Sequence, residues 1–165
     1  MLQNNNSLVK RLLAILLLAS TPALASDITR ASVVEAMNDY RAQHHLPPLR
    51  EDRRLDAAAG DRMSDMEDFG YWAHQSPDGR SPFVWLPTRG YEIHYAGENL
   101  ATGFETTEML IAGWMESPGH RANILSPHFE DCGVAIIDGM TMRRGAGKSI
   151  VVMFGAARVP AIATR

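Results

Sequence analysis

The sequence predicts an α+β domain in which helices pack on an antiparallel sheet. Up to about residue 125, capped segments with apolar residues at helical spacing follow one another. Two short runs of β-branched and apolar residues, 133–137 and 149–154, come near the end of the chain. Neither a repeat nor a linker divides the sequence, so helices and strands are expected to share one domain.

The first 25 residues have the pattern of an export signal. A basic pair at 10–11 precedes an apolar stretch at 12–18, and Ala23-Leu24-Ala25 is typical of a cleavage site. The apolar stretch is too short for an ordinary membrane-spanning helix. We therefore expect a signal peptide at 1–25 and one domain at 26–165 that is exported, either to the periplasm or to the medium, and has no transmembrane segment.

The charge balance and the cysteine content restrict the class of protein. The chain has 16 Lys and Arg against 19 Asp and Glu, a net charge of −3, which argues against a nucleic-acid partner. Cys132 is the only cysteine, so no disulfide can form within the chain, although export would permit one. Because Cys132 begins an apolar run, we expect a buried small side chain rather than a reactive thiol.

Capping patterns predict the first two helices. Ser32 begins a capping-box pattern, and the helix after it is expected to end near His44. Asp52 fits as the N-cap of a second helix, whose apolar residues recur along one face until Gly70. Both predicted helices carry apolar residues along one face, which is expected to pack on the sheet.

The remaining elements are shorter. A serine followed by a proline predicts a short helix at 82–90. Thr106 or Thr107 can cap a further helix, and Ser117 can start a short turn that holds His120. The segment 138–148, which contains three glycines, is interpreted as a turn or mobile hairpin loop between the two strands.

Glu98 and His120 are candidates for chemistry. Glu98 lies among apolar and small residues, where a carboxylate is costly to bury unless it is paired, and an imidazole is a natural partner. The alternative is a structural carboxylate that holds an irregular loop together. His120 follows a Ser-Pro-Gly helix break, so the dipole of the next helix would lower its pKa and favour a neutral ring. A surface or capping histidine is the alternative.

His74 and four other polar residues allow a structural or a functional interpretation. His74 follows an aromatic pair and is either a packed loop residue or part of a site. Arg41 and Arg121 could bind anions, but helical arginines usually cover apolar surface and form exposed pairs. Asn38 and Asn123 are expected to hydrogen-bond backbone groups.

These motifs together resemble the bacterial branch of the CAP superfamily, the cysteine-rich secretory proteins, antigen 5 and pathogenesis-related proteins that share the SCP domain. The resemblance is carried by His74, by Gly97-Glu98-Asn99-Leu100-Ala101 and by the run from Gly119 to Leu125, and it extends roughly over 34–154. It implies a three-layer α/β/α sandwich with a central antiparallel sheet. It also implies a cleft that contains His74, Glu98 and His120.

The resemblance includes a fourth cleft residue that this sequence does not clearly supply. Eukaryotic family members have a glutamate three residues after a helical tryptophan, whereas that position after Trp114 is Ser117. The nearest acid is Glu116, one residue earlier. Since one residue turns a helical side chain by about 100°, Glu116 is a candidate that can face away from the cleft.

Three functions remain open at this point. His74 and His120 could bind a divalent metal, zinc or copper, although no local metal-binding signature is present. A hydrolase of peptidase type, metal-dependent or assisted by His and Glu, is the second possibility, without an evident nucleophile motif. The third is a module that binds a small ligand, a lipid, a peptide or an envelope polymer. We favour a binding or metal-associated role over a hydrolase, and leave open whether the protein is an enzyme.

Overall fold

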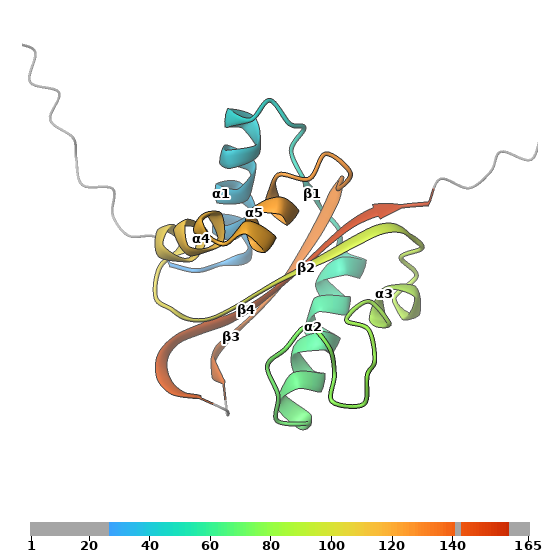
Figure 1. Cartoon of the computed structure of the whole chain (residues 1–165), viewed down its shortest axis with the longest axis vertical. Helices are drawn as coiled ribbons and strands as arrows, with labels where there is room; N and C mark the ends of the chain where they lie inside the picture. Colours follow the sequence, from blue (N-terminus) through green and yellow to red (C-terminus); the bar gives the residue numbers. More distant parts are fainter. Residues whose placement is uncertain (1–26, 141–142, 159–165) are drawn as a thin grey trace, which may run out of the picture.

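The computed structural model describes residues 27–140 and 143–158, so the predicted signal peptide lies outside the described residues. The elements in chain order are α1 (Arg30–Gln43), β1 (Arg50–Glu51), α2 (Arg53–Asp68), α3 (Trp85–Thr88), β2 (Ile93–Phe104), α4 (Thr107–Glu116), α5 (Pro118–Ile124), β3 (Asp131–Met140) and β4 (Arg143–Ala157). They form three layers, with α1, α4 and α5 on one face of the sheet and α2 and α3 on the other (Figure 1). The predicted α+β class and the α/β/α sandwich are confirmed.

The sheet has four strands in the order β1-β3-β4-β2. The long strands β2 and β3 both pair with β4 in antiparallel fashion; the sequence predicted the β3–β4 pair but not β2. The two-residue strand β1 was not predicted and runs parallel to the start of β3, with Arg50 opposite Asp131. The sheet is therefore antiparallel along its length and mixed only at one edge.

Alternation along the central strand gives the domain two hydrophobic cores. Ile150, Val152 and Phe154 point to the side of α1, α4 and α5. Val151 and Met153 point to the side of α2 and α3. Because successive residues of a strand face opposite sides of the sheet, one continuous apolar run supplies both cores. The side chains of both groups are fully buried.

Most helix starts follow the expected caps. Asp52 accepts a hydrogen bond from the Arg54 amide, and Thr106 accepts one from the Met109 amide. The first capping box lies three residues earlier than predicted, because Thr29 is the N-cap and Ser32 is its partner. Helix α3 is shorter than predicted: it begins at Trp85 and ends at Thr88, after a turn over 82–84.

Two interpretations of the sequence were wrong. The sequence did not predict a strand around Glu98, and one interpretation placed this residue in an irregular loop, but it lies inside β2, which pairs with β4 along most of its length. The segment 138–148 was expected to be a loop, but β3 continues to Met140 and β4 starts at Arg143. In both places pairing with a neighbouring strand satisfies the backbone and overrides the low strand preference of glycine and asparagine.

Two neighbouring residues of β3, Cys132 and Gly133, show how closely the helices pack on the two faces of the sheet. A Cβ atom on Gly133 would lie 2.2 Å from the backbone of Leu55 and Asp56. Only glycine therefore lets the start of α2 approach β3 this closely. The neighbouring Cys132 is fully buried, and burial raises the pKa of its thiol to about 12, so the predicted structural role is confirmed.

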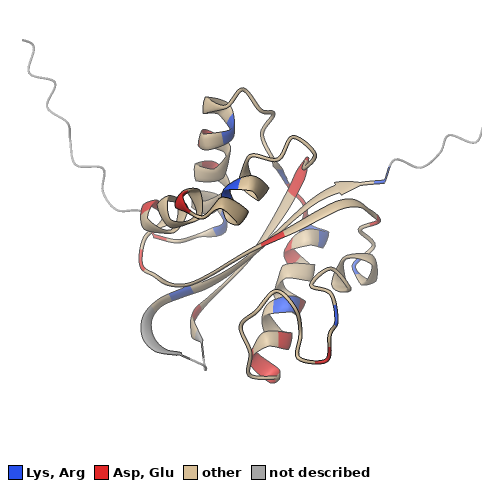
Figure 2. Cartoon of the chain, in the orientation of Figure 1, with Lys and Arg blue, Asp and Glu red and all other residues tan. Residues whose placement is uncertain are grey.

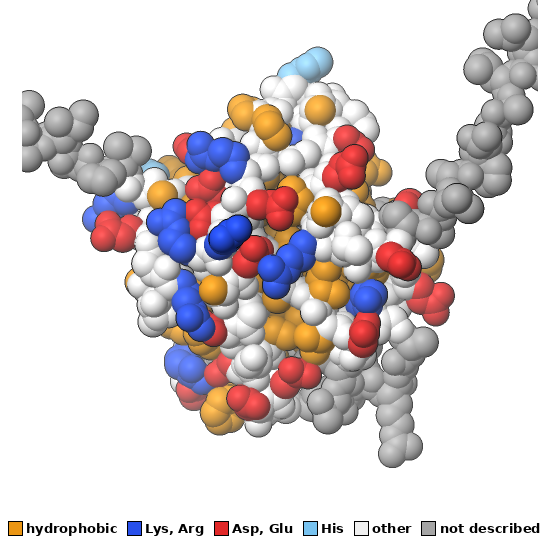
Figure 3. Space-filling model, turned by 180° about the vertical axis from the view of Figure 1, so that it is seen from behind, with side chains coloured by type: hydrophobic (Ala, Val, Ile, Leu, Met, Phe, Trp, Pro, Cys, Tyr) orange, Lys and Arg blue, Asp and Glu red, His pale blue; other side chains and the backbone are white. Residues whose placement is uncertain are grey.

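The surface carries charges of both signs. On the face opposite to that of Figure 1, basic and acidic side chains are interspersed rather than separated into large patches (Figure 3). Within the described ranges, no helix is both long and apolar enough to cross a bilayer.

Candidate functional site

Glu98 is the centre of the candidate site. It is the only acidic residue of β2, where Figure 2 shows an isolated acidic position midway along the strand. It lies opposite Met153 of β4, and its side chain is only 2% exposed. A carboxylate buried in a sheet is costly unless both of its oxygens have partners.

Both carboxylate oxygens of Glu98 have a partner. The Nε of Arg62 donates to Oε1 at 3.0 Å, and the Nδ1 of His74 lies 3.2 Å from Oε2. The two partners differ in exposure, because the Arg62 side chain is 0% exposed and the His74 side chain is 60% exposed. The predicted pairing of Glu98 with an imidazole is thus present, together with an arginine that the sequence did not indicate.

Arg62 is the centre of a buried polar network on α2 and the segment after it. Its guanidinium also donates to the hydroxyl of Tyr71 and to the carbonyl of Ala73. The Tyr71 hydroxyl in turn donates to Asp65 and contacts the Ser76 hydroxyl. This network fixes the segment that carries His74, so α2 positions both groups that hold Glu98.

Burial dominates the electrostatics of Glu98. Desolvation raises the pKa of its carboxyl group above the ordinary value, and the nearby Arg62 and His74 lower it by less. The paired carboxylate therefore takes up a proton more readily than a free glutamate. The pairing holds the carboxylate in place, while burial raises the pKa of its carboxyl group.

His120 lies beside His74. Their ring centroids are 6.5 Å apart, and the His120 ring is 6.2 Å from the ring of Trp114. The pKa of His120 is lowered, first by burial and then by His74. The predicted direction is confirmed, but the causes are burial and a neighbouring imidazole rather than the helix dipole that we expected.

Two asparagines join α5 to β2 and so bring His120 to Glu98. The Asn123 amide donates to the backbone oxygen of Glu98 at 3.0 Å and to the side-chain oxygen of Asn99 at 2.8 Å. The Asn99 amide donates to the backbone oxygen of His120 at 3.2 Å. A Cβ atom on Gly97 would lie 2.7 Å from the Phe129 ring. The segment 97–101 and the run 119–125, which carry the resemblance, therefore pack against each other.

Arg41 anchors the end of α5 and the loop after it. Its buried guanidinium donates to the carbonyl oxygens of Ile124, Ser126 and Phe129, and its Nε donates to Pro47. The expectation that Arg41 covers apolar surface or forms an exposed pair was wrong, because carbonyls of the connection gather around it. The prediction that Asn38 bonds backbone is confirmed by its contacts with Leu49.

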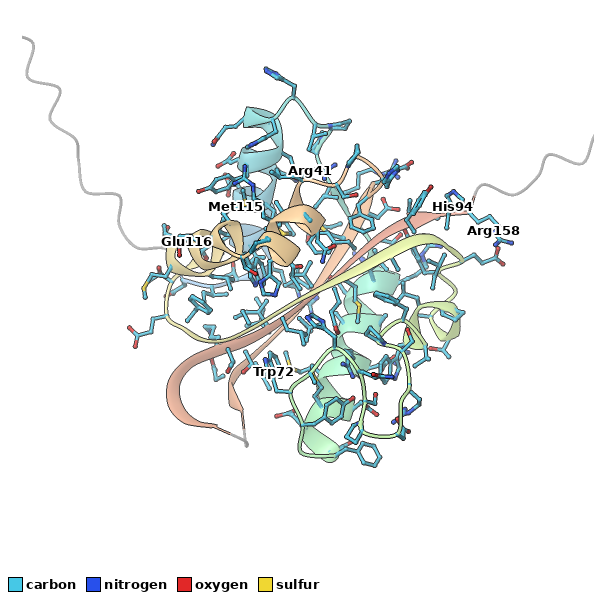
Figure 4. All side chains as sticks on the ribbon, in the orientation of Figure 1. Arg41, Trp72, His94, Met115, Glu116 and Arg158 are labelled. Atoms are coloured by element: carbon cyan, nitrogen blue, oxygen red, sulfur yellow. The ribbon has the colours of Figure 1, made fainter. Side chains whose placement is uncertain are left out.

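Glu116 does not join the other three residues. It is the last residue of α4, its side chain is exposed, and it forms no hydrogen bond or ion pair with any described residue. Figure 4 labels it on that helix. The buried Trp114 is two positions earlier, about 200° away around the helix. The structure thus brings together His74, Glu98 and His120.

The site does not fit a preformed metal centre. In the ranges that the structure describes, no group of three or more His, Cys, Asp or Glu side chains is arranged to hold an ion. Zinc sites in proteins use three or four protein ligands. Here two imidazoles lie close together, but the oxygens of Glu98 are occupied by Arg62 and His74.

The fold and the motifs define the chain as an SCP-type α/β/α domain with a buried glutamate that pairs with one histidine, and a second histidine beside that ring. The model of the cysteine-rich secretory protein family, CAP, matches residues 34–152. The chain therefore belongs to this family, in its bacterial branch.

Similar proteins come from several bacteria. The chain is 42% identical over 106 residues to the uncharacterized protein YkwD of Bacillus subtilis. The matched region covers 64% of this chain and 41% of that protein. It resembles the structure of an extracellular SCP-domain protein from Bacillus anthracis, with 28% identity and a TM-score of 0.64 over 76% of this chain and 39% of that one. An outer surface protein of Borrelia burgdorferi shares the fold at 18% identity, with a TM-score of 0.68 over 82% of this chain and all of that one. The chain spans less than half the length of the curated relatives that it matches.

Proposed function

We propose that this protein is an exported binding module that contacts its ligand through His74 and His120, with Glu98 as the group that positions His74. The observation that carries this proposal is the arrangement of Glu98, which is buried and paired with Arg62 on one side and with the exposed His74 on the other. Pairing through Nδ1 leaves the Nε2 of His74 for a ligand.

The surroundings of the two histidines favour binding over nucleophilic catalysis. Within 27–140 and 143–158, no hydroxyl or thiol side chain hydrogen-bonds to either ring. The thiol of Cys132 is buried, and its pKa is raised. A nucleophile normally needs a base within hydrogen-bond reach, so recognition is the function that these contacts support best.

Export is part of the proposal. The support comes from the signal-like pattern at 1–25 and from the similarity to an extracellular protein and an outer surface protein. Fractionation of the producing cells, with N-terminal sequencing of the recovered protein, tests it. We expect a new N-terminus near Ser26 in the periplasm or the medium, and recovery from the cytoplasm with residues 1–25 intact would contradict export.

The binding proposal is tested by sedimentation of the purified protein with isolated peptidoglycan and with phospholipid vesicles. We expect co-sedimentation with one of these, and its loss in both His74→Ala and His120→Ala. His44→Ala is the matched control, because it removes an exposed histidine at the end of α1. Retention by neither material, or unchanged retention of both site variants, would overturn the proposal.

A hydrolase is the second candidate, favoured by one observation. The raised pKa of Glu98 and its contact with His74 are features of an acid–base pair. A screen with peptides and peptidoglycan fragments tests this. Turnover that disappears in Glu98→Gln would replace the binding proposal with an enzymatic one, whereas turnover that survives unchanged would not come from this site.

Metal association stays a prediction with its own test. The close pair of imidazoles, one with a lowered pKa, is the observation in its favour. Calorimetric titration of metal-stripped protein with zinc tests it, and binding that either His74→Ala or His120→Ala abolishes would support a metal held by the two imidazoles. An absence of binding in the parent protein would eliminate the metal role and leave direct contact of the imidazoles with an organic ligand.

A further inference from the structure

A hollow lies beside the start of β2, at the end of the strand farther from α4. It has a volume of about 430 Å³ and is lined by His94 and Tyr95 of β2, by Pro127, His128 and Glu130 of the α5–β3 connection, and by Arg158 after β4. Figure 4 shows His94 and Arg158 next to each other at this end of the sheet. The volume falls within the range of small-molecule sites, roughly 300–1,000 Å³.

An irregularity in β2 forms one wall of the hollow. Ile93 pairs with Ala157 and Tyr95 pairs with Ala156, so His94 is an extra residue without a partner. Neighbours in a regular strand point to opposite faces, whereas here His94 and Tyr95 both line the hollow. Bulges of this kind redirect side chains and are frequent next to functional sites.

Three aromatic rings meet at this wall. Tyr95 stacks on His128 with centroids 4.7 Å apart, and His94 meets Tyr95 edge-on at 4.4 Å. Tyr95 is 42% exposed, one of the few large apolar side chains in the described ranges with this much exposure. The rings offer a surface on which the planar or apolar part of a ligand can pack.

The basic and acidic side chains that line the hollow do not pair with one another. Arg158 is exposed, and its guanidinium forms no ion pair with any residue that the structure describes. The acid in the lining, Glu130, pairs instead with Arg50 at 3.1 Å. The rings of His94 and His128 likewise have no hydrogen-bond partner in the described part of the chain. The Arg158 guanidinium and the two imidazoles are therefore polar groups of one lining that no described residue satisfies.

We propose that this hollow is a binding site for a small organic acid, in which Arg158 pairs with the anionic group and the Tyr95–His128 stack holds a ring or apolar body. An arginine fork can bind a carboxylate or a phosphate through two parallel hydrogen bonds. The aromatic wall then distinguishes an organic acid from a free inorganic anion. This site uses none of the residues of the His74, Glu98 and His120 site, so the two proposals stand independently.

The test is an NMR titration of the purified protein with benzoate and phenyl phosphate as probes, against benzamide without the charge and acetate without the ring. We expect one or both charged ring compounds to shift the signals of Tyr95 and His128 and to bind more tightly than benzamide and acetate. Arg158→Gln should weaken that binding about tenfold, the loss of one charge-assisted interaction. Lys148→Gln, which removes a positive charge near the other end of β4, should leave it unchanged.

The outcomes separate clearly. Tighter binding of benzoate than of phenyl phosphate identifies a carboxylate ligand, and the reverse order identifies a phosphate ester. Equal binding of benzamide and benzoate, or binding that Arg158→Gln leaves intact, would overturn the role of the arginine and with it the proposal. Acetate that binds as tightly as benzoate would show that the ring wall contributes nothing, which would overturn it as well.

Discussion

The two sides of Glu98 are built differently. On one side, Arg62 is completely buried and belongs to a network that includes Tyr71 and Asp65. On the other side, His74 is largely exposed, and its only hydrogen-bond partner among the described residues is the carboxylate. The same carboxylate thus connects a group that the fold requires with a group that faces solvent.

This difference separates stability from recognition. A buried ion pair that loses one partner leaves an uncompensated charge in the interior, whereas an exposed pair contributes little to stability. Changes on the Arg62 side should therefore disturb folding. Changes on the histidine side should leave folding nearly intact and affect binding. The following expectations test this division, from the largest effect to the smallest.

Arg62→Met should give the largest loss of stability. It leaves Glu98 and Asp65 without their buried cation, and we expect about 3–5 kcal/mol of destabilisation in urea unfolding. Arg89→Met is the matched control, because it breaks an exposed pair with Asp61 and should cost less than about 1 kcal/mol. Equal losses in the two variants would contradict the structural role of Arg62.

Asn123→Ala should give an intermediate loss. It removes the hydrogen bonds from α5 to Glu98 and Asn99, which should cost about 1–3 kcal/mol and shift the ring signals of His120 in NMR spectra. Asn38→Ala removes a similar side-chain contact far from the site and should cost stability without moving the His120 signals. Identical spectra for Asn123→Ala and the parent protein would contradict the role of Asn123 in joining α5 to β2.

The pH dependence of stability should report on His120. Because its folded-state pKa is lowered, His120 contributes stability above its ordinary pKa of 6.5, and this contribution is lost as the pH falls through the lowered value. The raised pKa of Glu98 acts in the opposite direction, since its contribution is present at low pH and is lost as the pH rises through the raised value.

Comparison of the parent protein with His120→Gln isolates the first of these effects. Unfolding free energies measured from about pH 7 to about pH 5 should fall less steeply in the variant, because it has no imidazole to protonate. A variant with the same slope as the parent protein would show that His120 keeps its ordinary pKa in the folded state.

His74→Ala should have the smallest effect on stability. Because the imidazole is 60% exposed, its removal lets water reach the Glu98 oxygen that it paired with, so the loss in thermal or urea unfolding should be about 1 kcal/mol or less. Binding to the material retained in the sedimentation assay should nevertheless be lost. If this variant were as unstable as Arg62→Met, the exposed side of the site would be structural, and the division between the two sides would fail.

Much of the fold follows from local sequence signals. The caps at Asp52 and Thr106 mark where helices begin, and the apolar run at 149–154 identifies the central strand. The strand β2 could not be found in this way. Its middle reads Ala96-Gly97-Glu98-Asn99, a composition poor in strand-forming residues, and its pairing with β4 depends on residues about fifty positions later.

The site was partly predictable for a similar reason. His74, Glu98 and His120 stand in motifs that identify the family, and the structure brings them together. Arg62 was missed because nothing in the sequence of α2 distinguishes a buried arginine from an exposed one. A signal was available in retrospect: a glutamate expected to be buried needs a cation as well as an imidazole. The helix that packs on that face of the sheet supplies it.

The tautomer of His74 tests the central claim most directly. If the Glu98 carboxylate accepts a hydrogen bond from Nδ1, the neutral ring carries its proton on Nδ1, and Nε2 is left for a ligand. Long-range proton–nitrogen NMR correlation of the imidazole should show this form in the parent protein and its loss in Glu98→Met, which has no oxygen to accept the hydrogen bond. A His74 ring protonated on Nε2, or one that Glu98→Met does not change, would contradict the arrangement on which the proposed function depends.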